Sequence, residues 1–126
     1  MANGLEQVGV DAFEGTRLRR SGVVAVAFLA EWCPFCQAFW PEFARLAETG
    51  PIRLLVADVT DTDSPLWDRF ALEVVPTVVV FREGMPGFRV DGVPGRGLSS
   101  TDLDAVARAA ASASHPGGAG SRGRKK

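Results

Sequence analysis

Long apolar runs alternate with amphipathic stretches along this chain. Residues 23–30 form a continuous run of small, β-branched and aromatic apolar side chains, and residues 52–59 follow the same pattern after their first two positions. Such runs are typical of strands buried on both faces of a sheet. Between them, residues 37–48 place apolar side chains at helical spacing, and Gly50 and Pro51 end this pattern. The order strand, helix, strand predicts a βαβ unit with parallel strands and a right-handed crossover.

A shorter strand and a core contact are expected before this unit. The strand lies over residues 5–8. Phe13 and Leu18 follow it and are expected to face a core, although Gly15 disfavours a helix between them. This N-terminal stretch therefore adds apolar side chains to the core without a clear helical element.

Three further elements are expected after residue 60. Pro65 begins a short helix. The buried face of this helix is expected to hold Leu66, Trp67, Phe70 and Ala71. Pro76 cannot donate a hydrogen bond to a sheet, so the next strand should start at Thr77. Residues 83–87 have turn chemistry, and residues 88–90 are expected to pair antiparallel across that turn as an edge strand.

A last helix and a polar tail complete the pattern. Residues 99–102 match a capping box in front of an amphipathic segment. From Ser114 onward the composition changes to Gly, Ser, Pro and basic residues, which is typical of disorder. We therefore expect one α/β domain over residues 1–113 and a disordered tail over residues 114–126.

Length, composition and charge exclude several classes of protein. With 126 residues and 46% hydrophobic side chains, the chain buries a core without disulfide staples or metals. Its formal net charge is −1, and four of the 14 basic side chains lie in residues 122–126. The body is therefore acidic, so no nucleic acid partner is expected. Residues 1–10 show no signal-peptide pattern, and no apolar run is long enough to cross a membrane. We expect a monomer in the cytoplasm that does not bind membranes.

Residues 32–36, with the sequence Trp-Cys-Pro-Phe-Cys, are the candidate reactive site. They contain both cysteines of the chain, and the loop between these cysteines is too short for a disulfide to contribute much stability. A zinc site needs four ligands, and the single histidine, His115, lies in the tail, so no metal is expected. Two thiols three positions apart at the start of a helix favour redox chemistry instead.

The two thiols are expected to have different roles. Cys33 lies where free backbone N–H groups and the positive end of the helix dipole favour a thiolate. Cys36 lies one turn further, faces the core and should stay protonated longer. Cys33 is therefore the expected nucleophile and Cys36 the resolving thiol. Pro34 suits the first helical turn, and Phe35 adds an exposed aromatic ring that could contact a bound peptide.

These residues resemble the thioredoxin family. The resemblance rests on residues 30–36, on the sequence Val-Pro-Thr at residues 75–77 and on Gly92, in the family's order, and it covers residues 5–112. It implies the thioredoxin fold, in which a central mixed β-sheet is flanked by helices on both faces. It also implies exchange with disulfide-containing protein substrates, recharging by a thioredoxin reductase, and no bound cofactor besides a redox-active disulfide between Cys33 and Cys36.

The resemblance further implies a peptide-binding groove around Cys33. Pro76 would be a cis-proline packed against the dithiol, and the backbone of Val75 would pair with an extended substrate segment. The implied substrate-binding residues are Trp32, Pro34, Phe35, Val75, Pro76 and Gly92. Val93 would extend this groove, whereas Trp67 is expected to be a packing residue.

Two departures from the family pattern concern proton transfer and the spacer between the thiols. Ala27 stands where most members carry a buried aspartate under the dithiol, and Val56 stands where a lysine often accompanies it. A buried carboxylate would accept the proton of the resolving cysteine, so water or Glu31 is expected to take over this role. Pro34 and Phe35 replace the usual Gly-Pro and resemble the spacer of glutaredoxins.

Two alternative functions stay open at this point. The sequence Cys-Pro-Phe-Cys favours a glutathione-dependent, glutaredoxin-like activity, although no clear cationic residue stands beside the cysteines to hold the glutathione carboxylates. Ala27 favours a redox-dependent binding module that keeps the fold but has weak turnover. The leading hypothesis remains a thiol–disulfide oxidoreductase that acts on proteins.

Overall fold

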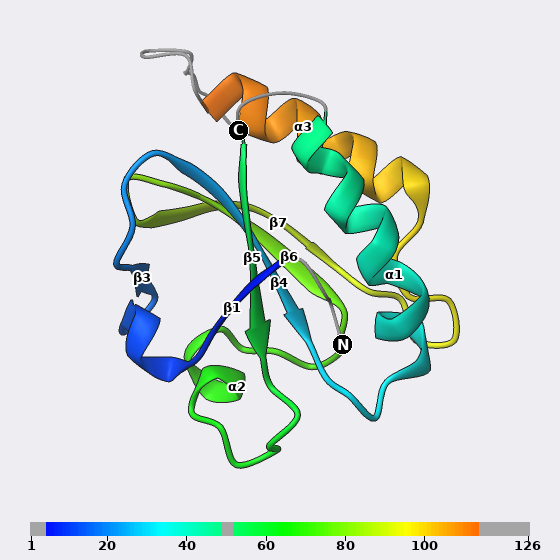
Figure 1. The fold of residues 1–126 in the computed structure, drawn as a ribbon. Helices are drawn as coiled ribbons and strands as arrows, with labels where there is room; N and C mark the ends of the chain where they lie inside the picture. Colours follow the sequence, from blue (N-terminus) through cyan, green and yellow to red (C-terminus); the bar gives the residue numbers. More distant parts are fainter. Residues whose placement is uncertain (1–4, 49–51, 114–126) are drawn as a thin grey trace.

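The computed structural model describes residues 5–48 and 52–113, which form a mixed five-stranded sheet with helices on both faces (Figure 1). The strand order is β1-β5-β4-β6-β7. Its strands are β1 (Glu6–Val8), β4 (Val23–Leu29), β5 (Arg53–Asp58), β6 (Thr77–Arg82) and β7 (Met85–Asp91). The helices are α1 (Pro34–Ala44), α2 (Leu66–Arg69) and α3 (Ser100–Ala113), and 3-10 turns lie at η1 (Val10–Ala12) and η2 (Arg45–Glu48). The predicted tail and the predicted stop at Gly50 and Pro51 lie outside the described residues.

β4 forms the centre of the sheet and leads into the reactive site. It runs parallel to β5, with Val26 opposite Leu55, and antiparallel to β6, with Val26 opposite Val79. Residues 24–29 are fully buried, as expected of a strand covered on both faces. The predicted parallel pair joined by a helix is therefore confirmed.

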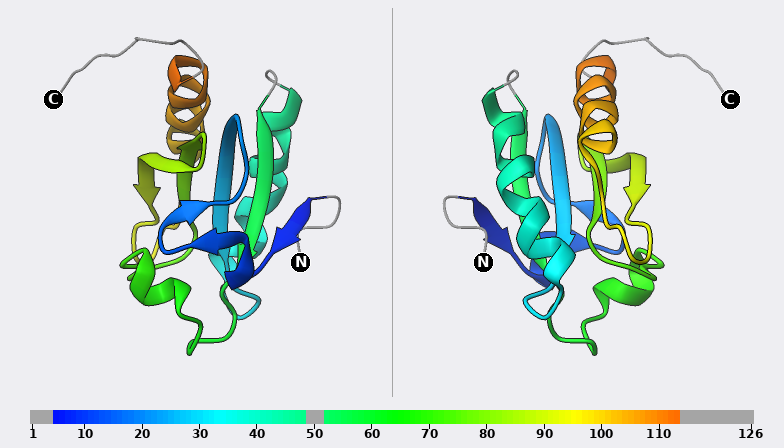
Figure 2. Two further views of the ribbon diagram at one scale, coloured as in Figure 1. Left: turned by 90° about the vertical axis from the view of Figure 1, so that its left-hand side faces the viewer. Right: turned by 90° about the vertical axis from the view of Figure 1, so that its right-hand side faces the viewer.

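Different elements cover the two faces of the sheet. α1 and α3 lie over one face, in the right-hand view of Figure 2, whereas α2 and the N-terminal segment lie over the opposite face, in the left-hand view. Phe43 and Val106 are fully buried beneath α1 and α3. This arrangement confirms the predicted mixed sheet with helices on both sides.

The N-terminal segment contains a small hairpin that covers the second face. β2 (Phe13–Glu14) pairs antiparallel with β3 (Arg17–Leu18), and Gly15 takes a positive φ of 60° in the turn. The ring of Phe13 lies edge-on to Phe70 with centroids 5.2 Å apart, and Leu18 is 1% exposed. The predicted core contacts of this stretch are thus confirmed.

β7 is longer than the sequence pattern indicated. Strand pairing begins at Met85, so three residues of the expected turn belong to the strand, and the turn shrinks to Glu83 and Gly84. Both turn residues have positive φ, 51° and 85°, which is the backbone of a tight two-residue hairpin turn. Pro86 is tolerated because β7 is an edge strand. A register shift between Val79 and Phe81 interrupts the pairing of β6 with β7.

α2 is a single turn that ends earlier than expected. Leu66 and Phe70 are buried, as predicted, but Ala71 is exposed and takes a positive φ of 49°. The helix has already ended at Arg69, and Ala71 lies in the turn that follows it. The expected contribution of Ala71 to the buried face is therefore wrong.

α3 begins with the predicted capping box. Ser99 N donates to Asp102 Oδ2 over 2.8 Å, and Asp102 N donates to Ser99 Oγ over 3.3 Å. These reciprocal bonds satisfy backbone donors that have no partner within the helix.

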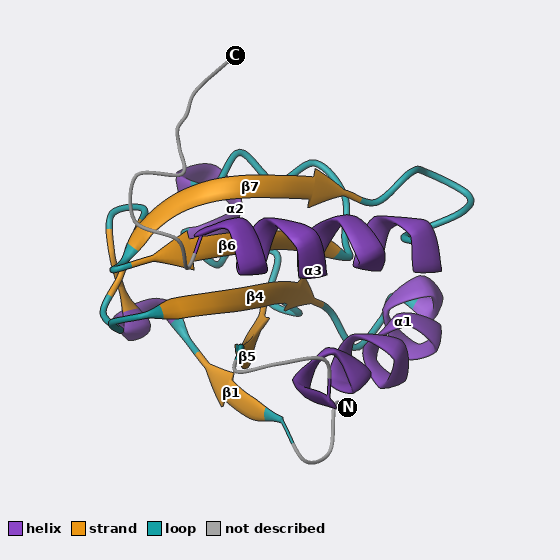
Figure 3. Cartoon of the chain, turned by 90° about the horizontal axis from the view of Figure 1, so that it is seen from above, coloured by secondary structure: helices purple, strands orange, loops and turns teal. Residues whose placement is uncertain are grey.

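In the view from above, β4 ends next to the start of α1 (Figure 3). The reactive site therefore lies at the carboxyl end of the central strand.

Candidate functional site

Cys33 is the N-cap residue of α1. Its backbone is extended, with φ −102° and ψ 109°, and Pro34 follows at the first helical position. Cys36 N donates to Cys33 Sγ over 3.2 Å, and Gln37 N donates to Cys33 O over 3.2 Å. One N–H group of the first turn thus points at the sulfur, which lies at the positive end of the helix dipole.

The two thiols occupy different environments. Cys33 is 4% exposed and donates a hydrogen bond to Val75 O, with a sulfur–oxygen distance of 3.5 Å. Cys36 is 0% exposed. Burial raises the pKa of the Cys36 thiol, and the hydrogen bond with Cys33 raises that pKa further, whereas the backbone of Ala30 acts in the opposite direction. Cys36 therefore lies where burial opposes its ionisation, and its role as the resolving thiol stays a prediction.

The loop before β6 closes the site from the other side. The peptide bond between Val75 and Pro76 is cis, as the family resemblance implied. Thr77 Oγ1 donates to Val74 O over 2.9 Å, and Gly92 N donates to Pro76 O over 2.9 Å. These bonds hold the carbonyl of Val75 where the Cys33 thiol reaches it.

Gly92 supports this loop by its small size. A Cβ atom at this position would lie 2.7 Å from the carbonyl oxygen of Pro76, too close for any side chain. Pro76 and Gly92 are both buried, and neither lines the groove described below. The structure therefore places these two predicted substrate-binding residues behind the groove, where they fix its backbone.

An open groove of about 290 Å³ lies beside Cys33. Within the part of the chain that the structure describes, it is lined by Trp32, Cys33, Pro34, Phe35, Trp67, Glu73, Val74, Val75, Val93, Pro94 and Gly95. Trp32 is 53% exposed and Phe35 is 39% exposed, so two aromatic rings face solvent next to the thiol. Exposed aromatic side chains beside a buried nucleophile are suited to binding a peptide segment. Four predicted substrate-binding residues line this groove, namely Trp32, Pro34, Phe35 and Val75.

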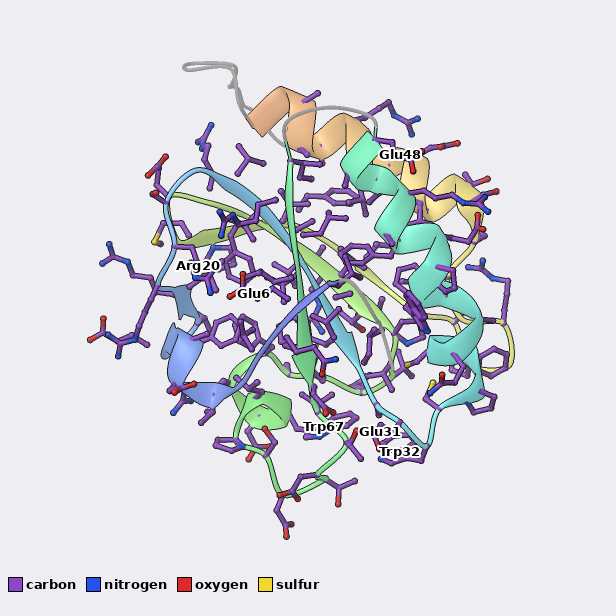
Figure 4. All side chains as sticks on the ribbon, viewed as in Figure 1. Glu6, Arg20, Glu31, Trp32, Glu48 and Trp67 are labelled. Carbon is purple, nitrogen blue, oxygen red and sulfur yellow. The ribbon has the colours of Figure 1, made fainter. Side chains whose placement is uncertain are left out.

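Trp67 lines the groove, although it was expected to be a packing residue. Its ring stacks on Trp32 with centroids 6.3 Å apart and an angle of 10° between the planes. Trp32 and Trp67 lie side by side at the lower end of the molecule (Figure 4). A signal for this contact exists in the sequence, because β4 and β5 are parallel and the residues that follow them reach the same edge of the sheet.

Ala27 and Val56 are both fully buried within the sheet. The positions at which the family resemblance implied an ionisable pair are thus apolar here. Glu31, the expected substitute proton acceptor, is exposed, whereas Cys36 is fully buried.

Within residues 5–48 and 52–113, no group of three or more His, Cys, Asp and Glu side chains is arranged to hold a metal ion. In the same part of the chain, no helix has the length and apolar character needed to span a membrane.

Comparisons with known proteins agree with this geometry. The family model for thioredoxin matches residues 5–104. The thioredoxin of Acidithiobacillus ferridurans is 32% identical over 85 residues, which are 67% of this chain and 79% of that protein. A protein disulfide-isomerase of Drosophila melanogaster is 37% identical over 68 residues, and this match spans 50% of the present chain but 14% of the relative's length.

A solved structure shares the fold. Thioredoxin f from spinach chloroplast, in its long form, superimposes with a TM-score of 0.68 at 23% identity, over 85% of this chain and 86% of that chain. The paired thiols at the start of α1 and the matched family model lead to one conclusion. This chain belongs to the thioredoxin family of thiol–disulfide oxidoreductases.

Proposed function

We propose that this chain reduces disulfides in protein substrates, with Cys33 as nucleophile and Cys36 as resolving thiol. The observation that carries the proposal is the position of Cys33 Sγ, which accepts a backbone N–H at 3.2 Å and lies 3.5 Å from Val75 O at an open groove. A sulfur in this position lies at the N-terminus of a helix and faces the segment that a substrate would contact.

The reaction transfers two electrons and two protons to the substrate. The Cys33 thiolate attacks one sulfur of the substrate disulfide, and the other sulfur leaves as a thiolate that takes up a proton from solvent. Cys36 then gives its proton to solvent, and its thiolate attacks Cys33 Sγ and breaks the mixed disulfide. The second substrate sulfur leaves as a thiolate and is protonated in turn. The chain ends as the Cys33–Cys36 disulfide, and a dithiol or a thioredoxin reductase restores both thiols by supplying two electrons and two protons.

The groove favours a peptide as the reacting partner. The backbone of Val75 lies beside the Cys33 thiol and offers an edge to which an extended substrate segment adds by strand pairing. Glutathione carries two carboxylates, and the charged side chain among the described lining residues is that of Glu73. This charge opposes the glutaredoxin-like alternative. A monomer in the cytoplasm that needs no bound cofactor stays a prediction.

A reduction assay with dithiothreitol and insulin tests the proposal. We expect catalytic amounts of the wild-type chain to accelerate insulin reduction, and Cys33→Ser to abolish the acceleration because no nucleophile remains. Cys36→Ser should instead accumulate a mixed disulfide between Cys33 and the substrate, visible as a mass increase that dithiothreitol reverses. A wild-type rate equal to that of the Cys33→Ser, Cys36→Ser double variant would contradict the proposal.

The apolar pair Ala27 and Val56 favours one second candidate, a binding module with weak turnover. Both positions are fully buried, so they offer no proton acceptor for the resolving step. In that case Cys33 still forms the mixed disulfide, but the wild-type chain releases its partner slowly. Detection of long-lived mixed disulfides in the wild type, and not solely in Cys36→Ser, would support this second function.

A further inference from the structure

The groove beside Cys33 combines aromatic rings with one unneutralised negative charge. Glu73 is exposed and lines the groove, and within the described part of the chain it forms no ion pair. Arg96 follows the groove residue Gly95, but its guanidinium pairs with Asp102 at 3.3 Å, toward the start of α3. The carboxylate of Glu73 is therefore available to a bound ligand.

The two tryptophans are held in fixed orientations by one loop. Trp32 Nε1 donates to Thr60 O over 2.9 Å. Trp67 Nε1 donates to Val59 O over 3.2 Å and to Asp61 O over 3.3 Å. Both indole N–H groups are bonded to the segment after β5, and the two rings stack on each other, so the groove is lined by the remaining surface of a fixed pair of rings. Rings that are anchored before binding lose little entropy when a ligand packs against them.

We propose that Trp32, Trp67 and Glu73 make this groove selective for substrate segments that carry an arginine or a lysine beside the disulfide cysteine. This specificity rests on the function proposed above. An indole face attracts a cation through its quadrupole, and a carboxylate on the same groove adds a charge-assisted hydrogen bond. The apolar stem of arginine or lysine suits the remaining wall, which is formed by Val74, Val93 and Pro94.

The opposite charge is disfavoured by the same residues. A substrate glutamate beside the cysteine would meet the like charge of Glu73 and the negative π faces of the two indoles. A purely apolar segment would use the walls but leave Glu73 unpaired. The groove therefore ranks neighbours of the disulfide in the order cationic, neutral, anionic.

Short peptide disulfides test this order. We would use dimers of Gly-X-Cys-Gly amide in which X is arginine, citrulline or glutamate, and follow single-turnover oxidation of the reduced chain. Citrulline keeps the shape of arginine without its charge. Since a neighbouring charge also changes the intrinsic reactivity of the peptide, each rate is divided by the rate of the same peptide with dithiothreitol.

The wild-type chain should prefer arginine over citrulline by about fivefold, and raising the salt concentration should reduce this preference. Glu73→Gln should lose most of it, and Trp67→Leu part of it. Glu48→Gln is the matched control, since it removes the same charge at the end of η2, at the opposite end of the molecule from the tryptophans (Figure 4). It should keep the full preference.

The outcomes separate this inference from the proposed function. If the wild type oxidises all three peptides and Glu73→Gln leaves the ratio of arginine to citrulline unchanged, the selectivity is wrong and the oxidoreductase function stands. If the wild type reacts with none of the peptides and does not reduce insulin, both are wrong. A preference that falls equally in Glu73→Gln and Glu48→Gln would reflect net charge and would also overturn the assignment to this groove.

Discussion

Ala27 of β4 lies directly opposite Val56 of β5 in the parallel register, and both side chains are 0% exposed. The two departures from the family pattern are therefore neighbours in space. A buried carboxylate at position 27 would need a cation to offset its desolvation, and position 56 is its neighbour on the adjacent strand. Because both positions are apolar in this chain, neither side chain can accept a proton, and no buried charge needs to be compensated.

Introducing the carboxylate should change both properties. Ala27→Asp should cost about 3 kcal/mol in free energy of unfolding, because it buries an unpaired polar group. Adding Val56→Lys should recover part of this loss. The double variant should resolve mixed disulfides about tenfold faster than wild type, because the carboxylate accepts the proton of Cys36. Urea unfolding and rapid-quench analysis of the mixed disulfide measure the two effects.

Ala27→Asn is the control for this experiment. It matches aspartate in size but accepts no proton, so it should destabilise the chain without accelerating resolution. Equal resolving rates for the aspartate and asparagine variants would show that proton transfer from Cys36 does not limit the wild type.

The buried thiol of Cys36 should make the reduced chain sensitive to alkali. Burial raises the pKa of Cys36 above its unfolded value, so the stability contributed by this group is fully present below the unfolded pKa of about 8.5. It is lost as the pH rises further, because the unfolded state then releases the proton and the folded state does not. The expected slope reaches about 1.4 kcal/mol per pH unit.

Urea unfolding between pH 8 and pH 11 under reducing conditions measures this slope. The sequence contains no tyrosine, and its two lysines lie at its last two positions, so few other groups titrate in this range. Cys36→Ala should flatten the profile, whereas Cys33→Ala should keep it. A steep profile in Cys36→Ala would assign the effect to another group.

Gly92→Ala should displace the backbone that positions Val75 beside the Cys33 thiol. The new Cβ would lie 2.7 Å from the carbonyl oxygen of Pro76, so the backbone next to Val75 must shift. We expect a loss of about 1–3 kcal/mol in stability and a slower reaction of Cys33 with substrate. Gly87→Ala is the control, because its Cβ would meet the nearest atom, Val80 O, at an ordinary 3.5 Å. Its stability should stay within about 0.5 kcal/mol of wild type.

The capping box of α3 should contribute to stability above acidic pH. The backbone hydrogen bond from Ser99 lowers the pKa of Asp102, and the Ser99 hydroxyl and Arg96 lower it further, against the effect of burial. The stability from Asp102 is therefore present above the unfolded pKa of about 3.9 and is lost as the pH falls below it. Ser99→Ala should cost about 1 kcal/mol at pH 7.

Unfolding in urea from pH 7 down to pH 2.5 checks this assignment. Asp102→Asn should be less stable at neutral pH and lose less stability on acidification. Asp104→Asn alters a neighbouring exposed carboxylate of the same helix and should reproduce the wild-type acid profile. If both variants show the same acid profile, Asp102 does not carry the effect.

The sequence predicted those elements in which local pattern and burial agree. The run at residues 23–30 became β4, and the segment around Cys33 became the start of α1, because strand burial and helix capping depend on neighbouring residues. The position of Cys36 in the core followed from helical spacing. The cis bond before Pro76 followed from the family resemblance, since proline alone does not determine the isomer.

The missed features depend on contacts between distant segments. Trp67 is half-buried and looks like a packing residue in isolation, and its position in the groove arises from the stack on Trp32, 35 positions earlier in the sequence. Glu73 resembles any surface carboxylate until the groove is assembled. The hairpin at Phe13 and Leu18 was missed because its two-residue strands are too short to show alternation.

The register shift between Val79 and Phe81 has a consequence for the outer edge of the sheet. β7 is the edge strand on this side, and it combines the irregular pairing with Pro86, which offers no N–H, and with the charged side chain of Arg89. Each of these features hinders the docking of a second sheet edge. On the other side, β1 has three residues, too few to template a long ladder. The two edges of the sheet therefore offer few free backbone groups for pairing with another strand, whereas the groove beside Cys33 is open.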